Sequence, residues 1–185
     1  MPPGIVATAA TNPASTKPIH PMRGDTFMSG THEAPIEADE LLQLLPHRFP
    51  FLLVDRIVEM EAGVRISGLK NVTLDEPFFG THAGGAMIMP GLLIIEAMAQ
   101  TGAVLLMVEQ EPPKRKLVYF ASLNHATWHG VVRPGDQLQL NITVTQARGR
   151  VRKVHGVALV RGSLICEADL AAVVVDKEPT SLGTP

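Results

Sequence analysis

Two polar residues, Glu96 and Gln100, lie inside the most apolar stretch of this 185-residue chain. The stretch reads LLIIEAMAQTGAVLLMV at 92–108, and the acid and the amide are four residues apart. In an α-helix that spacing places both side chains on one face. A carboxyl group buried without partners tends to keep its proton, and a protonated carboxyl can act as a general acid. The spacing fits a structural role equally well, with Glu96 paired to a basic group.

A histidine in a glycine-rich segment is the second candidate for chemistry. His82 lies in FFGTHAGG at 78–85, which holds three glycines. Imidazole titrates near neutral pH and can accept a proton, and glycine allows the backbone to expose N–H groups to a ligand. A lone loop histidine is more often a surface residue. The helix start at Pro90-Gly91 and the acid fourteen residues downstream add weight to a role in catalysis, and the surface interpretation stays open.

The helix that carries Glu96 is predicted to span about 91–109. Pro90 suits a first helical turn, and Gly91 lets the backbone approach another group closely. At about 25 Å the helix is nearly long enough to cross a bilayer. Because two polar residues lie at its middle and strands flank it in the sequence, we favour a core helix wrapped by a sheet and expect no membrane span.

Strand-like runs occur on both sides of this helix. A short amphipathic helix is expected at 36–45, ending before Pro46. The strands are expected at 51–61, 64–73, 117–123, 137–147, 150–160 and 163–175. Turns rich in glycine and proline separate most of them, and the short turns between the last three favour antiparallel pairing.

Composition divides the chain into a leader, one domain and a tail. Residues 1–35 contain six of the fifteen prolines among small and polar residues, so a disordered leader is expected there. An organelle transit peptide is the less favoured alternative, because the segment is poor in arginine. The domain is expected at 36–177 and a flexible tail at 178–185.

Charge and cysteine content exclude several classes of protein. The chain has 16 Lys and Arg against 18 Asp and Glu, a formal charge of −2, which argues against nucleic acid as the main partner. A single cysteine, Cys166, excludes a disulfide within one chain and fits the reducing cytoplasm. His125 and His129, on either side of Trp128, lack a third ligand, so no metal is expected.

Five motifs follow one another in a specific order and spacing. They read LPHRFPFLLVDR at 45–56, KNVT at 70–73, EPFF at 76–79, IMPGLLIIEAMAQ at 88–100 and RPGD at 133–136. Together they resemble the Z-type 3-hydroxyacyl-acyl-carrier-protein dehydratases of bacterial type II fatty-acid synthesis. The resemblance runs from about 36 to 176 and leaves the leader uncovered. Within the first motif, His47 and Arg48 are expected to position the chain as it enters the first strand.

This resemblance implies the hot-dog fold, an α+β domain in which a long antiparallel sheet curls around one central helix. Members of the family form homodimers, which in some cases assemble as trimers of dimers, and each active site takes a His from one chain and a Glu from the other. By position in the motifs, His82 and Glu96 are expected to be the catalytic pair, and the Gly91 N–H is expected to bind the thioester carbonyl. Further substrate contacts are expected at Gly85, Gln100 and Phe79.

The reaction implied by the resemblance is the removal of water from a (3R)-3-hydroxyacyl thioester to give the trans-2-enoyl thioester. The substrate is carried on the phosphopantetheine arm of an acyl carrier protein. His82 would take the C2 proton, and Glu96 would protonate the departing hydroxyl. Nothing is oxidised overall, so no metal or redox cofactor is expected.

A basic stretch is the expected binding surface for the acidic carrier. Between 112 and 153 the chain has eight basic residues and one acid. Strand alternation is expected to place Arg148, Arg150 and Arg152 on one strand face, where a solvated edge strand is the alternative interpretation. The expected carrier contacts are Arg133, Arg148, Arg150, Arg152 and Lys153.

The segment around His82 departs from the family pattern. Members usually read GHFPG followed by a basic or similar residue and proline, whereas this chain reads THAGGAM at 81–87. Gly84 in place of proline gives the segment more conformational freedom, and Ala83 in place of phenylalanine removes an apolar wall. Two other functions therefore stay open: a different hot-dog acyl-thioester enzyme, such as a thioesterase, and an acyl-binding subunit with little or no activity.

Overall fold

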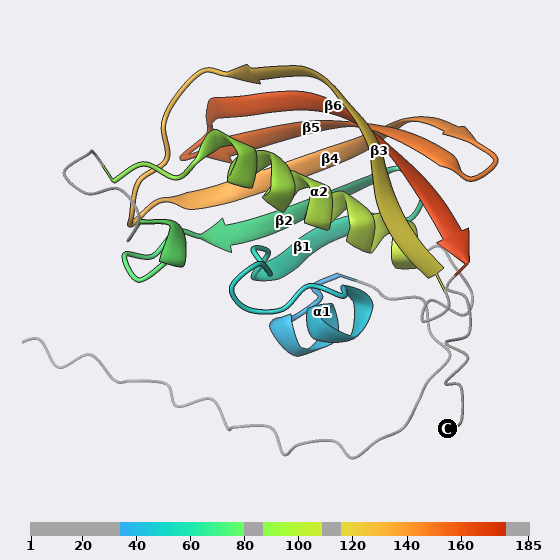
Figure 1. Ribbon diagram of the computed structural model, residues 1–185, viewed down its shortest axis with the longest axis horizontal. Coiled ribbons are helices and arrows are strands. Elements are labelled where there is room, and N and C mark those ends of the chain that lie inside the picture. Colours follow the sequence, from blue (N-terminus) through green and yellow to red (C-terminus); the bar gives the residue numbers. More distant parts are fainter. Residues whose placement is uncertain (1–33, 80–86, 109–115, 177–185) are drawn as a thin grey trace, which may run out of the picture. The chain divides into compact units, whose positions relative to one another are not determined.

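The computed structural model describes residues 34–79, 87–108 and 116–176, in which one antiparallel sheet packs against one long helix (Figure 1). The strands lie in the order β1-β2-β4-β5-β6-β3. In chain order the elements are α1 (Ala38–Leu44), β1 (Arg56–Glu61), β2 (Arg65–Asn71), the 3-10 helix η1 (Pro77–Phe79), α2 (Gly91–Val108), β3 (Lys116–Trp128), β4 (Gln137–Arg148), β5 (Val151–Val160) and β6 (Ser163–Asp176). The predicted leader and tail, at 1–35 and 178–185, lie almost wholly outside the described residues, so the domain boundaries stay predictions.

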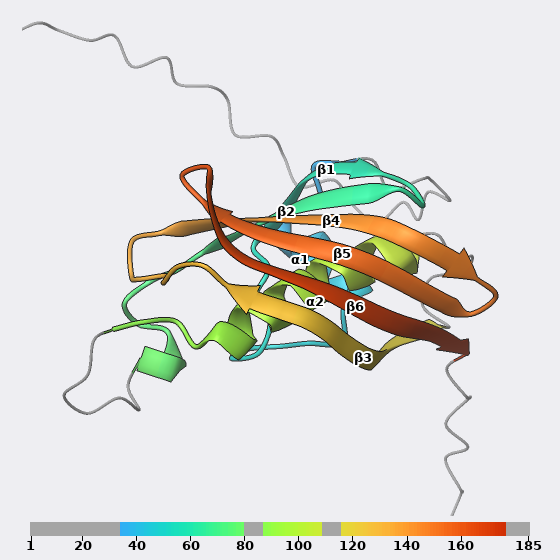
Figure 2. The same ribbon diagram turned by 90° about the horizontal axis from the view of Figure 1, so that it is seen from above.

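The sheet curls around α2 and buries most of it (Figures 1 and 2). Strands β2 to β6 all contact the helix. On β4 the side chains of Leu138, Leu140 and Ile142 point inward and are fully buried, because every second residue of a strand faces the same side. The prediction of a central helix at 91–109 is confirmed. By length and composition α2 could also cross a membrane, but 72% of it is buried inside this domain.

The chain before β1 differs from the predicted strand at 51–61. The sheet begins only at Arg56, and 51–55 is irregular. Two backbone groups of this segment bond to a side chain of the central helix: Leu53 N–H donates to Gln100 Oε1 at 2.9 Å, and Phe51 C=O accepts from Gln100 Nε2 at 2.7 Å. At its end, Asp55 N–H donates to Leu69 C=O of β2 at 2.9 Å. Strand propensity alone does not reveal a side-chain partner.

The prediction that Arg148, Arg150 and Arg152 share one strand face is wrong, because the chain reverses between them. Arg148 ends β4, Gly149 and Arg150 form the turn, and Arg152 lies in β5 opposite Ala147. Gly149 has a φ of +56°, which glycine adopts without strain at the first position of a tight hairpin turn. The three arginines therefore gather at the end of one hairpin.

Gly68 on β2 allows the sheet to approach α2 closely. A Cβ at this position would lie 2.9 Å from Thr101 Oγ1 and 3.0 Å from Thr101 Cγ2. Interiors are packed to near-crystal density, so an added methyl group there must displace the helix or the strand.

Gly68→Ala is therefore expected to lower the free energy of unfolding by about 1–3 kcal/mol, the usual cost of overpacking. Thr101→Ala in the same chain removes the opposing atoms and is expected to restore most of the loss. Gly102→Ala is the matched control, because its Cβ would meet Ile142 at an ordinary 3.5 Å. Urea unfolding followed by circular dichroism measures all three; equal stability of Gly68→Ala and wild type contradicts the prediction.

Candidate active site

Glu96 projects from the second turn of α2 and keeps contact with solvent. Its side chain is 23% exposed, so the fully buried carboxyl considered from the sequence is not what a single chain shows. The Oε1 atom accepts a hydrogen bond from Gln100 Nε2 at 2.8 Å and lies 3.6 Å from His47 Nε2. These contacts share one oxygen, which leaves Oε2 as the carboxylate atom open to a ligand.

Gln100 is the buried partner of this carboxylate. The residue is 1% exposed, and its amide bonds to the backbone of Phe51 and Leu53 as well as to Glu96. Both N–H groups of the amide are thus donated to protein acceptors. The predicted contact of Gln100 with substrate stays a prediction; within the chain, its amide holds the Glu96 carboxylate and the backbone before β1.

His47 is a site residue that the sequence analysis assigned only to chain positioning. Its ring lies beside Glu96, and its Nδ1 is buried without a hydrogen-bond partner among the described residues. The Phe51 ring lies 6.2 Å away, centroid to centroid. The one signal available in the sequence was the position of His47 in the motif at 45–56, since its distance from Glu96 along the chain gives no hint of contact.

The beginning of α2 provides the second polar feature of the site. The first N–H groups of a helix have no intrahelical acceptor, and the helix dipole favours negative charge there. Gly91 is the first residue of α2, and the indole of Trp128, at the end of β3, lies directly against it. A Cβ on Gly91 would be only 2.4 Å from Trp128 Nε1. Glycine is therefore required for this contact.

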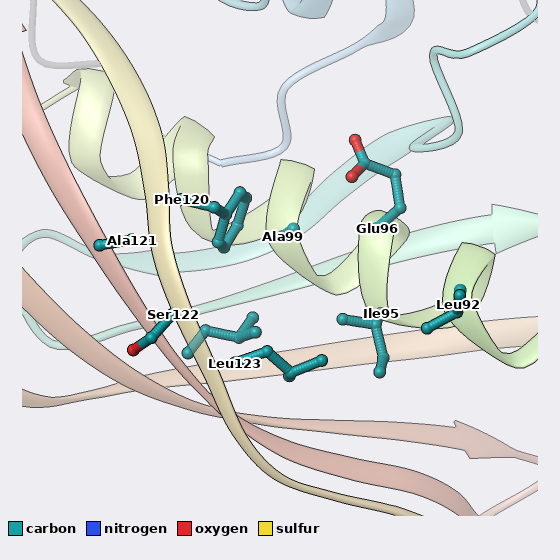
Figure 3. A pocket seen from close by; sticks show the side chains of 9 residues that line it. Leu92, Ile95, Glu96, Ala99, Phe120, Ala121, Ser122 and Leu123 are labelled. Carbon is teal, nitrogen blue, oxygen red and sulfur yellow. The ribbon is translucent and has the colours of Figure 1, made fainter.

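An open, mostly apolar pocket lies between α2 and β3 (Figure 3). Among the residues that the structure describes, Glu96 is the only charged one that lines it. Ile95 and Glu96 extend from the helix in different directions (Figure 3), so the wall of the pocket has an apolar part and an acidic part. The lining residues are Leu92, Ile95, Glu96, Ala99, Phe120, Ala121, Ser122, Leu123 and Leu170. Such a surface suits an acyl chain that carries one polar group.

The predicted catalytic residue His82 and the predicted substrate contacts Gly85 and Phe79 have different outcomes. His82 and Gly85 lie outside the described residues, so the structure tests neither. Phe79, at the end of η1, is 5% exposed and packs against Phe78 with ring centroids 4.6 Å apart. In a single chain it belongs to the hydrophobic core.

The predicted carrier contacts do not form one surface in the chain. Arg133 precedes β4, and Val132 beside it accepts a hydrogen bond from Met89 N–H, close to the start of α2. The hairpin cluster of Arg148, Arg150, Arg152 and Lys153 lies at the other end of β4. That strand of 12 residues is about 36 Å long, so Arg133 and the cluster are separated by the length of the sheet.

Two other reactive side chains, Cys166 and His129, are inert or already paired. Burial, aided by the charge of Glu167, raises the pKa of Cys166 to about 11, so this thiol is not a nucleophile at neutral pH. His129 pairs with Glu167 at 2.9 Å. The described residues contain no cluster of three or more His, Cys, Asp or Glu that could hold a metal ion.

Comparisons with known proteins agree on one family. A family model described as a FabA-like domain matches residues 45–169. The 3-hydroxyacyl-acyl-carrier-protein dehydratase FabZ of Nitratiruptor sp. is 46% identical over 147 residues, covering 77% of this chain and 99% of that protein. The FabZ of Bacillus subtilis is 43% identical over 135 residues, covering 73% of this chain and 95% of that protein.

Solved structures with low identity share the fold. The dehydratase heterocomplex ApeI:P from Xenorhabdus doucetiae matches with a TM-score of 0.64 at 18% identity, covering 74% of this chain and 91% of that chain. A thioesterase from Haemophilus influenzae matches with a TM-score of 0.57 at 15% identity, covering 82% of this chain and 99% of that chain. These likenesses confirm the predicted α+β hot-dog architecture.

The contact between Gly91 and Trp128 can be tested by fluorescence, because Trp128 is the single tryptophan of the chain. Gly91→Ala is expected to push the indole away from the start of α2, shift its emission to longer wavelength and destabilise the protein by about 1–3 kcal/mol. Gly102→Ala adds the same methyl group to the same helix without a clash and should leave the emission unchanged. An unchanged spectrum of folded Gly91→Ala contradicts the contact.

Proposed function

The chain belongs to the FabA-like family, with the 3-hydroxyacyl-acyl-carrier-protein dehydratases as its relatives, and from this membership we propose the reaction and the roles of its residues. The reaction is dehydration of a (3R)-3-hydroxyacyl thioester of acyl carrier protein to the trans-2-enoyl thioester during fatty-acid synthesis. The proposal includes no metal or redox cofactor, because elimination of water changes no overall oxidation state. It assigns the enzyme to the cytoplasm.

The observation that carries the proposal is the spacing of Gly91 and Glu96 on one helix. Five residues separate them, a rise of about 7.5 Å. Four bonds join the thioester carbonyl oxygen to the C3 hydroxyl oxygen, about 5 Å in an extended substrate, and a hydrogen bond of about 2.8 Å at each end lets the two protein groups lie up to about 10 Å apart. One substrate can therefore bind the Gly91 N–H through its carbonyl and the Glu96 carboxyl through its hydroxyl.

In the proposed reaction three groups act on this substrate. The Gly91 N–H at the positive end of α2 stabilises the negative charge that develops on the thioester oxygen. His82 accepts the C2 proton, and the electron pair of that C–H bond forms the C2–C3 double bond. The C3–O bond breaks as Glu96 gives its proton to the hydroxyl, which leaves as water. The proton gained by His82 and the one lost by Glu96 then exchange with solvent.

We propose that two chains build each site. The strand β3 lies at one edge of the sheet and is 13 residues long. Its exposed side chains include Tyr119, Phe120 and Leu123, and Leu92 beside the pocket is 68% exposed. A long apolar edge is prone to pair with another chain. Pairing of two such edges would cover these residues, and the family pattern leads us to propose that Glu96 acts with His82 of the partner subunit.

Basic residues are proposed to guide the acidic carrier to this site. Arg133 is the first contact to consider, because it lies near the start of α2. At the hairpin cluster, Asp176 compensates part of the charge: it binds Lys116 and lies 3.4 Å from Arg150 Nη2. The solvated hairpin remains the alternative interpretation of the cluster.

One observation favours a second candidate function. The segment at 81–87 lacks the proline and the phenylalanine usual in the family, so an acyl-binding subunit with weak activity is the alternative. The other alternative, a thioesterase, is supported only by the shared fold.

The purified protein is expected to convert 3-hydroxyacyl carrier substrates to the enoyl form, detected as a loss of one water by mass spectrometry. His82→Ala and Glu96→Gln are each expected to lower kcat by about 10²–10⁴-fold, the usual contribution of a general acid or base. Glu61→Gln, which changes an exposed carboxylate on β1, is the control and should keep full activity.

Two other outcomes of this assay contradict the dehydratase proposal. Release of free acid and carrier thiol without enoyl product identifies a thioesterase. Binding of the acyl carrier with no turnover above the His82→Ala level identifies a non-catalytic subunit. Short and long acyl chains are compared in parallel, so that a changed chain-length preference is not mistaken for inactivity.

A further inference from the structure

His47 and Gln100 approach the same oxygen of Glu96 from different parts of the chain. Gln100 Nε2, one turn further along α2, donates to Oε1 at 2.8 Å. His47 Nε2, in the segment between α1 and β1, lies 3.6 Å from the same atom. Within the described residues, no hydrogen bond or ion pair involves Oε2. The Glu96 carboxyl therefore has one oxygen in contact with protein groups and one without such a contact.

The chain around His47 is fixed by the side chain of its neighbour. Arg48 Nη1 donates to the carbonyl of Leu45 at 2.8 Å and to the carbonyl of His47 at 2.7 Å. Leu45 is 2% exposed and belongs to the hydrophobic core. The Phe51 ring lies beside the imidazole. His47 is thus held next to Glu96 by contacts that do not involve Glu96 itself.

The surroundings of the His47 imidazole select one of its two neutral forms. A neutral imidazole carries its proton on one nitrogen and a lone pair on the other. Nδ1 is buried without a hydrogen-bond partner among the described residues, and Nε2 faces the carboxylate, which when ionised only accepts hydrogen bonds. A proton on Nδ1 would leave a buried donor unpaired and turn the Nε2 lone pair toward the carboxylate oxygen. We therefore expect the proton on Nε2.

We infer that His47 is a positioning residue for the acid: its Nε2–H and the Gln100 amide together occupy Oε1 and keep the catalytic proton of Glu96 on Oε2. The inference rests on the proposed function, in which Glu96 protonates the departing hydroxyl. Two donors at Oε1 use both lone pairs of that oxygen and leave Oε2 for the proton. The 3.6 Å separation is longer than a hydrogen bond, and catalytic contacts of this kind often shorten when substrate binds. His47 is not among the residues that line the pocket, so it acts through Glu96.

The test compares two amides at position 47 by steady-state kinetics. The side-chain nitrogen of glutamine reaches the place of Nε2, whereas that of asparagine reaches only the place of Nδ1. His47→Gln is therefore expected to keep kcat within about threefold of wild type. His47→Asn is expected to lower kcat by about 10–10²-fold, as a misplaced catalytic group does, and to change KM by less than about threefold. His155→Ala is the control and should change neither, because it removes a His–carboxylate pair, 2.8 Å from Asp169, that lies outside the pocket.

The Glu96→Gln background separates positioning from a general loss of structure. If His47 acts through Glu96, His47→Asn lowers the residual activity of Glu96→Gln by less than about threefold, because residues that act as a unit are not additive. A larger loss in that background overturns the inference, as does an equal kcat of the His47→Gln and His47→Asn chains.

A second measurement uses the wild-type chain alone and so does not depend on a variant that folds. Nitrogen–proton NMR of the histidine rings distinguishes protonated from bare ring nitrogens, and the ring of His47 is assigned through its bonds to the backbone. A proton on Nε2 at neutral pH is expected, and a bare Nε2 overturns the inference. A wild-type chain without turnover, or a fully active Glu96→Gln chain, contradicts the proposed function instead, because neither result depends on position 47.

Discussion

The arrangement of the site depends on the buried amide of Gln100. This one side chain bonds to Leu53 N–H, to Phe51 C=O and to the Glu96 carboxylate. A buried polar group left without a hydrogen bond costs about 1–3 kcal/mol. Turning α2 or moving the chain before β1 would break these bonds, so the amide fixes the position of the two segments relative to each other. Glu96 is held as a consequence, with one oxygen occupied and the other open.

The enclosing sheet determines where chemistry is possible. Most of α2 is covered by the strands that curl around it, and the residues of α2 that line the open pocket, from Leu92 to Ala99, lie in its first half. The helix start at Gly91 and the carboxylate of Glu96 both lie in that part, five residues apart. A second chain on the β3 edge would close the pocket, as the proposed site shared between two subunits requires.

Residue patterns predicted most of the fold but only part of the site. Hydrophobic periodicity located α2 and the sheet strands. It failed at 51–55, where backbone groups form hydrogen bonds with the distant side chain of Gln100. The contact between Glu96 and Gln100 could be predicted, because side chains four residues apart lie on the same face of a helix. The contact of His47 with Glu96 depends on how the chain folds back.

The most direct test of a site shared between two chains mixes inactive His82→Ala and Glu96→Gln proteins after unfolding and refolding them together. Half of the randomly formed dimers are heterodimers, and each has one intact site of two, so about one quarter of wild-type activity is expected. Heterodimers demonstrated by differential tags but without recovered activity would show that His82 and Glu96 do not act across the interface.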